Sequence, residues 1–313
     1  MPEVRSAALV LRTFDHGESD RLVHLYTEAL GRVSAIAKGA RRSRRRFPGT
    51  LEIFNVLEVR LVDPPRASLM RLEAASFGRA FEGLGRDLGR YAIACQLLEM
   101  LDRFTGEGEA SPALYRFAIG ALGVLESEQP DRLLALLVVA KTLARVGLRP
   151  ELLVCTGCGA ELSSVGEGTA FFAPRHGGGR CPECAEPGEV RVGARILRAL
   201  EIGIRRPLRE REALGLEGTE VEEIEHLIDR FFRFHVGAEL RTAPFLRTVL
   251  AREGPSSRLL DGGRDPGDTA PAPPLGTPRA AASEPVQDGL PESLQDDRWG
   301  ALQGEEELWR PDG

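Results

Sequence analysis

The sequence predicts a multidomain α+β protein, and three changes of pattern along its 313 residues carry this prediction. Residues 4–77 alternate apolar and polar positions in short runs between glycines, which is the pattern of β-strands. From Phe81 onward, apolar residues recur three and four positions apart, which indicates helices. Two closely spaced pairs of cysteines then interrupt the helical pattern, and beyond Arg252 the chain becomes rich in Pro, Gly, Ala, Asp and Glu.

The N-terminal part, residues 1–79, is predicted to be a small β-barrel. Its strands are expected at 4–11, 22–26, 33–37, 53–62 and 69–77. About five short strands with glycine-marked turns in roughly 80 residues fit a barrel such as the OB-fold. Because OB-folds bind oligonucleotides, we interpret this part as a nucleic-acid-binding domain.

Residues 80–150 and 191–253 are predicted to form the two parts of one helical domain. Three apolar stripes at helical spacing lie within 93–101, 114–125 and 133–143, and the spacing resumes after 191. Ser111-Pro112 and Pro130-Asp131 mark helix starts, and Gly147 marks a stop. Amphipathic helices bury their apolar faces against one another, so these helices imply a bundle.

Four cysteines in residues 151–190 predict a zinc ribbon inserted between the two helical parts. Cys155 and Cys158 form one pair, Cys181 and Cys184 the other, and residues 159–180 separate them. Two residues within each pair let both thiolates reach one ion, so four sulfurs can surround Zn2+ as a tetrahedron. Such a site has no open coordination position, so the zinc is expected to be structural and not catalytic.

Other interpretations of these cysteines are open at the level of sequence. Two disulfides would need an oxidising compartment, and a redox-active pair is a further alternative. His176 is close enough in sequence to replace one thiolate, although it also fits an ordinary loop histidine. The fifth cysteine, Cys95, lies in an apolar helical stretch and fits a small core residue.

Charge is distributed unevenly along the chain. The formal net charge is −6, but residues 254–313 carry −7 and residues 1–80 carry +5. The Pro- and Gly-rich composition of 254–313 predicts a disordered acidic tail. The first residues lack an apolar signal segment, and the longest apolar run, 133–140, is too short to span a bilayer. We therefore expect a cytoplasmic, nucleoid-associated protein that does not bind membranes.

A cluster of cations between two predicted strands is the candidate DNA-binding site. Its members are Lys38, Arg41, Arg42, Arg44, Arg45 and Arg46. Cations that neutralise phosphates release counterions, and aromatic faces on a small barrel can stack on unpaired bases. Phe47 lies beside the cluster and Phe14, Tyr26 and Phe54 lie in the same part of the chain, and one or two of these aromatic residues are expected to face DNA. The alternative is a solvated loop beside aromatic residues that all lie in the core.

The sequence does not predict an enzyme. It contains no phosphate-binding G-x-x-x-x-G-K-[ST] motif, no H-E-x-x-H zinc motif and no G-x-S-x-G nucleophile motif. Asp15, Glu18 and Asp20 are close enough in sequence to suggest Mg2+ ligands. In a turn between strands, however, such residues more often face solvent or pair with neighbours such as Arg21.

Several runs of this sequence resemble the RecO family of bacterial recombination mediators. They are Leu9-Val10-Leu11-Arg12, Gly17-Glu18-Ser19-Asp20-Arg21-Leu22, Thr27, Gly31-Arg32 and Lys38-Gly39-Ala40-Arg41-Arg42. The cysteines fall where that family carries its zinc site, and 231–246 resembles its C-terminal helical segment. The resemblance covers residues 4–250; the longer arginine run and the acidic tail depart from it.

The resemblance implies both a fold and an activity. It implies an OB-fold, a helical domain with a zinc finger, and binding to single- and double-stranded DNA. It further implies annealing of complementary strands coated by single-strand-binding protein, and work with RecR, and in many bacteria RecF, to load RecA at gaps. The alternative function is a zinc-ribbon interaction scaffold whose basic module binds RNA or acidic proteins. The tail, with Trp299 and Trp309 among acidic residues, is either a solubilising segment or an internal competitor for a basic surface.

Overall fold

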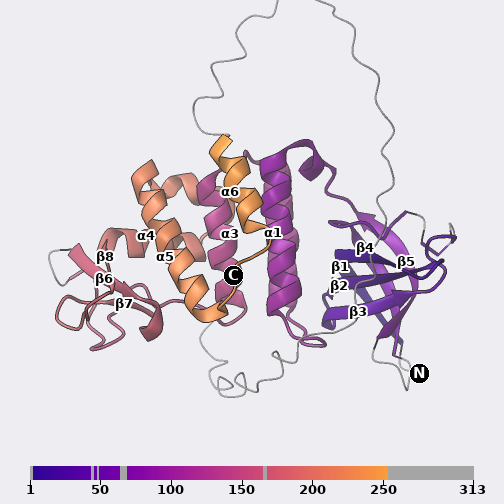
Figure 1. Ribbon diagram of the computed structural model, residues 1–313, viewed down its shortest axis with the longest axis horizontal. Coiled ribbons are helices and arrows are strands. Elements are labelled where there is room, and N and C mark those ends of the chain that lie inside the picture. The colour runs from indigo at the N-terminus through magenta and orange to yellow at the C-terminus, as the bar shows by residue number, and fades with distance from the viewer. Residues whose placement is uncertain (1–2, 44–45, 48, 64–68, 165–167, 253–313) are drawn as a thin grey trace, which may run out of the picture. The chain divides into compact units, whose positions relative to one another are not determined.

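The computed structural model describes residues 3–252 except 44–45, 48, 64–68 and 165–167 (Figure 1). The predicted acidic tail, 254–313, lies outside the described residues, as do Arg44 and Arg45 of the cation cluster. Within the described part, the predicted barrel, helical region and cysteine cluster are confirmed. None of its helices is long and apolar enough to cross a membrane.

The N-terminal strands close into a five-stranded barrel. They are β1 (Glu3–His16), β2 (Asp20–Thr27), β3 (Gly31–Ala37), β4 (Val56–Val62) and β5 (Met70–Arg79). The order around the barrel is β1-β2-β3-β5-β4, and only the β3–β5 pairing is parallel. This is the closed Greek-key arrangement of an OB-fold. The predicted strand at 53–62 begins three residues late, because Phe54 has a positive φ of 70° and sits in a turn before β4.

Strand β1 contributes to two different cores. Val10 points into the barrel, whereas its neighbours Leu9 and Leu11 point outward and pack with the helices. A bulge between Val10 and Arg12 shifts the register, so Leu11 and Arg12 do not alternate as they would in a regular strand. The barrel and the helices therefore share a packed interface along the outer face of β1 and β2.

Two turns in the sequence fix where the barrel meets the helices. Gly31 has a positive φ of 66°, and a Cβ at this position would overlap the carbonyl oxygen of Glu109. The β2–β3 turn can therefore approach the α1–α2 connection only with glycine at this position. The backbone N–H of Ser34 donates to the Glu107 carboxylate at 2.9 Å and strengthens the same contact.

The helical region follows the barrel and resumes after the cysteine segment. Its elements are η1 (Glu82–Arg86), α1 (Leu88–Phe104), α2 (Pro112–Ser127), α3 (Arg132–Arg145), α4 (Ala194–Arg205), η4 (Leu208–Leu214), α5 (Gly218–Val236) and α6 (Ala243–Arg252). The predicted helix starts are confirmed: the Ser111 and Asp131 side chains accept hydrogen bonds from the N–H groups of Leu114 and Leu134. In Figure 1, α3 lies between α1 and α5.

The cysteine segment forms a small sheet packed on the helices. Its elements are β6 (Thr169–Ala173), η3 (Pro174–His176), β7 (Gly178–Arg180) and β8 (Val190–Gly193), in the order β7-β6-β8. Phe172 of β6 contacts Phe231 of α5 at a ring-centroid distance of 6.1 Å. Cys155 and Cys181 are buried in the same core as the helices, so the ribbon is continuous with the helical region.

Candidate metal centre and nucleic-acid interface

The four predicted zinc ligands converge. The Sγ atoms of Cys155, Cys158, Cys181 and Cys184 all lie within 4.8 Å of one another. The Sγ atoms of Cys158 and Cys181 are 3.7 Å apart. Four sulfurs at a Zn–S distance of about 2.3 Å form a tetrahedron whose edge is about 3.8 Å, so the spacing fits a zinc ion. It is far longer than the roughly 2.05 Å of a disulfide, and all four thiols are free.

Backbone groups support the sulfurs. The N–H groups of Gly157 and Cys181 donate to the Cys155 Sγ at 3.4 and 3.3 Å. Burial raises the pKa of Cys155, but these N–H donors outweigh it and bring the pKa to about 6. A Cβ on Gly157 would lie 3.1 Å from the Cys184 Sγ, so the absence of a side chain lets the two halves approach. The thiolate form that a metal requires is therefore favoured at Cys155.

The remaining sulfurs show why a cation fits here. Hydrogen bonds with the neighbouring thiols of Cys181, Cys158 and Cys155 raise the pKa of Cys184 to about 12. Without a cation, the negative charge of one thiolate disfavours ionisation of a neighbouring thiol. A divalent ion removes this repulsion, because metal coordination deprotonates a thiol outright. The donor set, spacing and charge all match a structural zinc site.

His176 does not join the cysteine cluster. Its Nε2 lies 3.4 Å from Glu186 and 3.9 Å from Glu189, in a separate group of possible ligands. The same two carboxylates also pair with Arg175 and Arg180. These arginines compete with a cation for the carboxylates, so we interpret this group as an ion-pair network that fastens the ribbon.

The described cations of the basic loop, residues 38–46, are held beside the β1–β2 turn. Arg41 lies 3.6 Å from Asp15, and Arg42 lies 3.8 Å from Glu18 with 73% of its side chain exposed. Arg46 donates to the Lys38 carbonyl oxygen at 2.7 Å, and its guanidinium lies 5.4 Å from the centre of the Phe47 ring. The loop is thus folded upon itself, with Lys38, Arg41 and Arg42 exposed and Arg46 half-buried.

The acidic residues of the β1–β2 turn brace this loop. Asp20 accepts the Gly39 N–H at 2.8 Å, and this bond holds the pKa of Asp20 below its usual value. The N–H of Arg41 donates to the Ser19 carbonyl oxygen at 3.0 Å. Asp15 also pairs with Arg21 at 3.5 Å. Asp15 and Glu18 thus pair with arginines, and Asp20 accepts a backbone hydrogen bond, as expected of acidic residues in and beside a turn.

The structure distinguishes among the aromatic residues that the sequence offered for base contact. Tyr26, Phe47 and Phe54 are buried, whereas Phe14 is 39% exposed. The sequence alone did not identify Phe14, because aromatic residues in strands mostly lie in the core. It also missed Arg12 and His24, whose side chains contact Phe14. A signal was present, since Phe14 directly precedes the polar run Asp15-His16-Gly17 that ends the strand.

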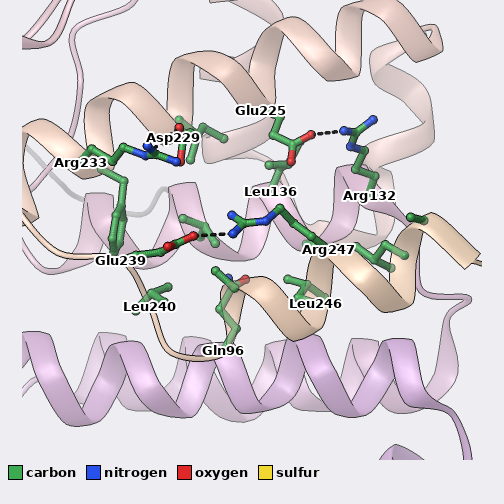
Figure 2. Close-up of a pocket in the computed structure, with 17 residues that line it drawn as sticks. Gln96, Arg132, Leu136, Glu225, Asp229, Arg233, Glu239, Leu240, Leu246 and Arg247 are labelled. Carbon is green, nitrogen blue, oxygen red and sulfur yellow. Dashed lines mark hydrogen bonds and ion pairs between the residues drawn. The ribbon is translucent and has the colours of Figure 1, made fainter.

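The helical region contains a groove with an apolar lining and arginines at its edges. It has a volume of about 420 Å³ and lies between α3, α5 and α6, with α1 at its base (Figure 2). Its apolar lining includes Leu136, Leu240 and Leu246. Its three arginines are all paired, Arg132 with Glu225 and Arg247 with Glu239 at 2.5 Å and Arg233 with Asp229 at 3.0 Å, so its edges carry little net charge.

Comparisons with known proteins agree with this architecture. The family model described as "Recombination protein O N terminal" matches residues 1–81, which cover the barrel, and "Recombination protein O C terminal" matches residues 85–244. The chain is similar to the DNA repair protein RecO of Anaeromyxobacter dehalogenans strain 2CP-C, with 34% identity over 256 residues, which is 80% of this chain and 98% of that protein. Its similarity to RecO of Myxococcus xanthus strain DK1622 is 34% over 249 residues, covering 77% and 96% of the two chains. The chain therefore belongs to the RecO family.

Proposed function

We propose that this protein is a mediator of DNA repair and recombination that binds single- and double-stranded DNA. Its membership of the RecO family and the names of its relatives support a role in DNA repair. The observation that carries the proposal is the basic loop folded against the β1–β2 turn of an OB-type barrel. Lys38, Arg41 and Arg42 are exposed, and Phe14, an exposed aromatic residue, lies in β1 next to the same turn. Exposed cations and an exposed aromatic ring are the combination that single-strand binding requires.

The phosphate contacts are assigned to Lys38, Arg41, Arg42, Arg44, Arg45 and Arg46. Arg44 and Arg45 lie outside the described residues and are included from the sequence alone. The ion pairs of Arg41 and Arg42 are 3.6 and 3.8 Å long and solvent-exposed. Exposed pairs of this kind contribute little energy, so a phosphate can replace the carboxylate at small cost.

Annealing follows from charge neutralisation. Two complementary strands repel one another through their phosphates, and a cationic loop that binds one strand lowers the charge that the second strand meets. We propose that the protein anneals complementary strands coated by single-strand-binding protein, and that with RecR, and where present RecF, it helps to load RecA at gaps. No covalent step is needed, so no catalytic residue is assigned.

We infer that the four cysteines hold a structural Zn2+. The supporting observations are the tetrahedral spacing of the sulfurs, the N–H groups that donate to Cys155, and the burial of Cys155 and Cys181. Four protein ligands leave no position for substrate, so the ion would fasten the ribbon to the helical core. The proposed location of the protein is the cytoplasm, in association with the nucleoid.

DNA binding across a salt series tests the proposal. The loop variant carries Arg41→Ala, Arg42→Ala, Arg44→Ala, Arg45→Ala and Arg46→Ala. Fluorescence anisotropy with a labelled single strand is expected to show weaker binding and a smaller slope of log K against log salt, by about 0.7 for each phosphate that the variant no longer neutralises. A control replaces three exposed arginines outside the loop, Arg5, Arg60 and Arg116, by Ala. Because the control removes three charges and the loop variant five, the decreases are compared per charge removed. An equal decrease per charge in both variants would assign the effect to total charge and overturn the loop assignment.

A further inference from the structure

The outer face of β1, β2 and β3 is apolar over most of its length, and the helices cover only part of it. Leu9 of β1 and Tyr26 of β2 face each other on this side and are buried in the helical core. Farther along the strands come two more cross-strand rows. The first contains Arg12, His24 and Ser34, and the second contains Phe14, Leu22 and Ile36.

The helices cover the outer face as far as the first of these two rows. The end of α1 and the α1–α2 connection reach the first row, where Asp102 meets Arg12 and His24 and the Ser34 N–H donates to the Glu107 carboxylate at 2.9 Å. In the described part of the chain the second row is more open: Phe14 is exposed, and Leu22 and Ile36 are half-buried. Arg71 of β5 lies next to Ile36 in the parallel pairing and extends the row with an exposed cation. We call Phe14, Leu22 and Ile36 the platform.

Asp102, near the end of α1, fixes the residues around the Phe14 ring. Its carboxylate accepts from His24 Nδ1 at 2.8 Å and from Arg12 at 3.4 Å. The Arg12 guanidinium lies 4.9 Å from the centre of the Phe14 ring, and the His24 ring meets it edge-on at 5.6 Å. Burial raises the pKa of Asp102, but the His24 and Arg12 contacts outweigh it and hold this pKa below its usual value. The carboxylate is therefore charged and can hold both partners.

The platform and the basic loop adjoin the same β1–β2 turn. Phe14 directly precedes Asp15, which pairs with Arg41, and the Arg41 N–H donates to the Ser19 carbonyl oxygen in that turn. Because Phe14 and Asp15 are consecutive in β1, their side chains leave opposite faces of the strand, so a single strand bound at Arg41 and Arg42 would reach the platform by crossing the edge of the barrel at this turn. In the OB-fold, this face of strands 2 and 3 and the adjacent loop are where oligonucleotides bind. An apolar row beside exposed cations complements bases attached to phosphates.

We propose that Phe14, flanked by Leu22 and Ile36, stacks on an unpaired base of the bound single strand, and that Asp102 positions Phe14 through Arg12 and His24. This inference rests on the proposed function. It assigns base contact to the platform and phosphate contact to the loop. Phe14 is a binding residue, whereas Asp102 acts only through other side chains.

The first experiment separates stacking from charge. Phe14→Ala is expected to weaken binding of a single-stranded oligonucleotide roughly 5- to 150-fold, as removal of one stacked base does, with an unchanged salt slope. The matched control is Phe77→Ala, because Phe77 is 57% exposed on β5 but lies outside the platform; it should bind as wild type does. Phe14→Tyr should retain most of the affinity, because it keeps the aromatic face.

The outcomes distinguish this inference from the proposed function. If wild type binds and Phe14→Ala binds equally well, the platform is wrong and the DNA-binding proposal stands. If wild type does not bind single strands, both are wrong. If Phe14→Ala loses binding of a protein partner but not of DNA, the face is a protein-docking surface and the stacking proposal is overturned.

The second experiment tests Asp102 with a spectroscopic signal of stacking. An oligonucleotide containing 2-aminopurine should lose fluorescence on binding wild type, and the loss should be smaller with Asp102→Asn. Glu99→Gln is the matched control, because Glu99 lies on the same helix but accepts from Arg241 and Thr242, away from the barrel. Asp102→Glu should restore part of the signal. Equal signals for Asp102→Asn and wild type, at equal thermal stability, would overturn the positioning role.

Discussion

The cysteine cluster and the basic loop are built in opposite ways. In the cluster, four sulfurs converge within 4.8 Å, backbone N–H groups point at them, and two of the four residues are buried. In the loop, Arg41 and Arg42 are exposed and pair with Asp15 and Glu18 only at 3.6 and 3.8 Å. The difference indicates that the buried, convergent cysteine cluster should control the stability of the fold, whereas the exposed basic loop should control DNA binding.

The arginines of the two regions show the same contrast. Near the cysteine cluster, Arg180 is largely buried and pairs with Glu186 and Glu189. Arg211, only 3% exposed, pairs with Asp131 at 2.7 Å and Glu128 at 3.3 Å. These arginines stabilise the fold. The number of arginines is therefore a poor indicator of DNA binding. The exposure and ion pairing of each arginine side chain are better indicators.

The largest expected effect concerns the cysteine cluster. Cys158→Ser should lower the zinc content measured by atomic absorption and lower the melting temperature, because structural zinc contributes about 10–16 kcal/mol in small zinc-finger peptides. Cys95→Ser is the control, since Cys95 lies on α1 outside the cluster. Full zinc content together with an unchanged melting temperature in Cys158→Ser would show that the site assignment is wrong.

Arg211→Met tests whether a buried arginine acts on stability alone. It should lower the free energy of unfolding by about 2–3 kcal/mol, because Asp131, Glu128 and the Gln129 carbonyl oxygen lose their donor. Urea unfolding measures this change. Affinity for single-stranded DNA, measured by anisotropy, should equal that of wild type. A folded variant with weakened DNA binding would break the contrast between the two regions.

The carboxylates that pair with the basic loop should lower its affinity for DNA. The double variant Asp15→Asn, Glu18→Gln removes two negative charges beside Arg41 and Arg42 while keeping side-chain size. Affinity for a single strand should rise about twofold to fivefold at low salt, and the gain should shrink as salt screens the charges. Glu3→Gln, at the start of β1, serves as a control. Unchanged or weaker binding by the double variant would contradict this interpretation of the loop.

Lys141 predicts a dependence of stability on pH. Its ammonium is buried and donates to the carbonyl oxygens of Ile204 and Arg206 at the end of α4. Burial, with the charge of Arg145, lowers the pKa of Lys141 to about 8, below its unfolded value of 10.5. Between these values the unfolded chain binds more protons, so stability should rise with pH, by at most about 1.4 kcal/mol per pH unit.

The Lys141→Met variant isolates this contribution. Unfolding free energies measured by urea between pH 8 and 10 should rise less steeply in the variant than in wild type. Below pH 8 the two pH profiles should run parallel, because Lys141 is then charged in both the folded and the unfolded chain. Equal slopes in the upper window would show that Lys141 does not titrate as proposed.

The sequence predicted what depends on local spacing. The two cysteine pairs, the caps at Ser111 and Asp131, and the alternation in 22–26 and 33–37 each specify their structure within a few residues. It could not predict which aromatic ring is exposed, because burial depends on what packs above a strand.

The contacts around Asp102 were beyond sequence reasoning for the same reason. Asp102 is 90 residues from Arg12 and 78 from His24, and only the packing of α1 on the barrel brings them together. The turn acids are an intermediate case. Their proximity to cations was expected from the turn, but the hydrogen bond of Asp20 with Gly39 and the ion pair of Asp15 with Arg41 required the loop to fold back on the β1–β2 turn.

Annealing of complementary oligonucleotides coated with single-strand-binding protein tests the central claim most directly. Wild type and the loop variant are compared by fluorescence energy transfer across a salt series. We predict that wild type anneals the coated strands, and that the loop variant, with zinc bound and the fold intact, loses both the rate and its salt dependence. If neither protein anneals while both are folded, or if both anneal at the same rate, the assignment of this function to the basic loop is contradicted.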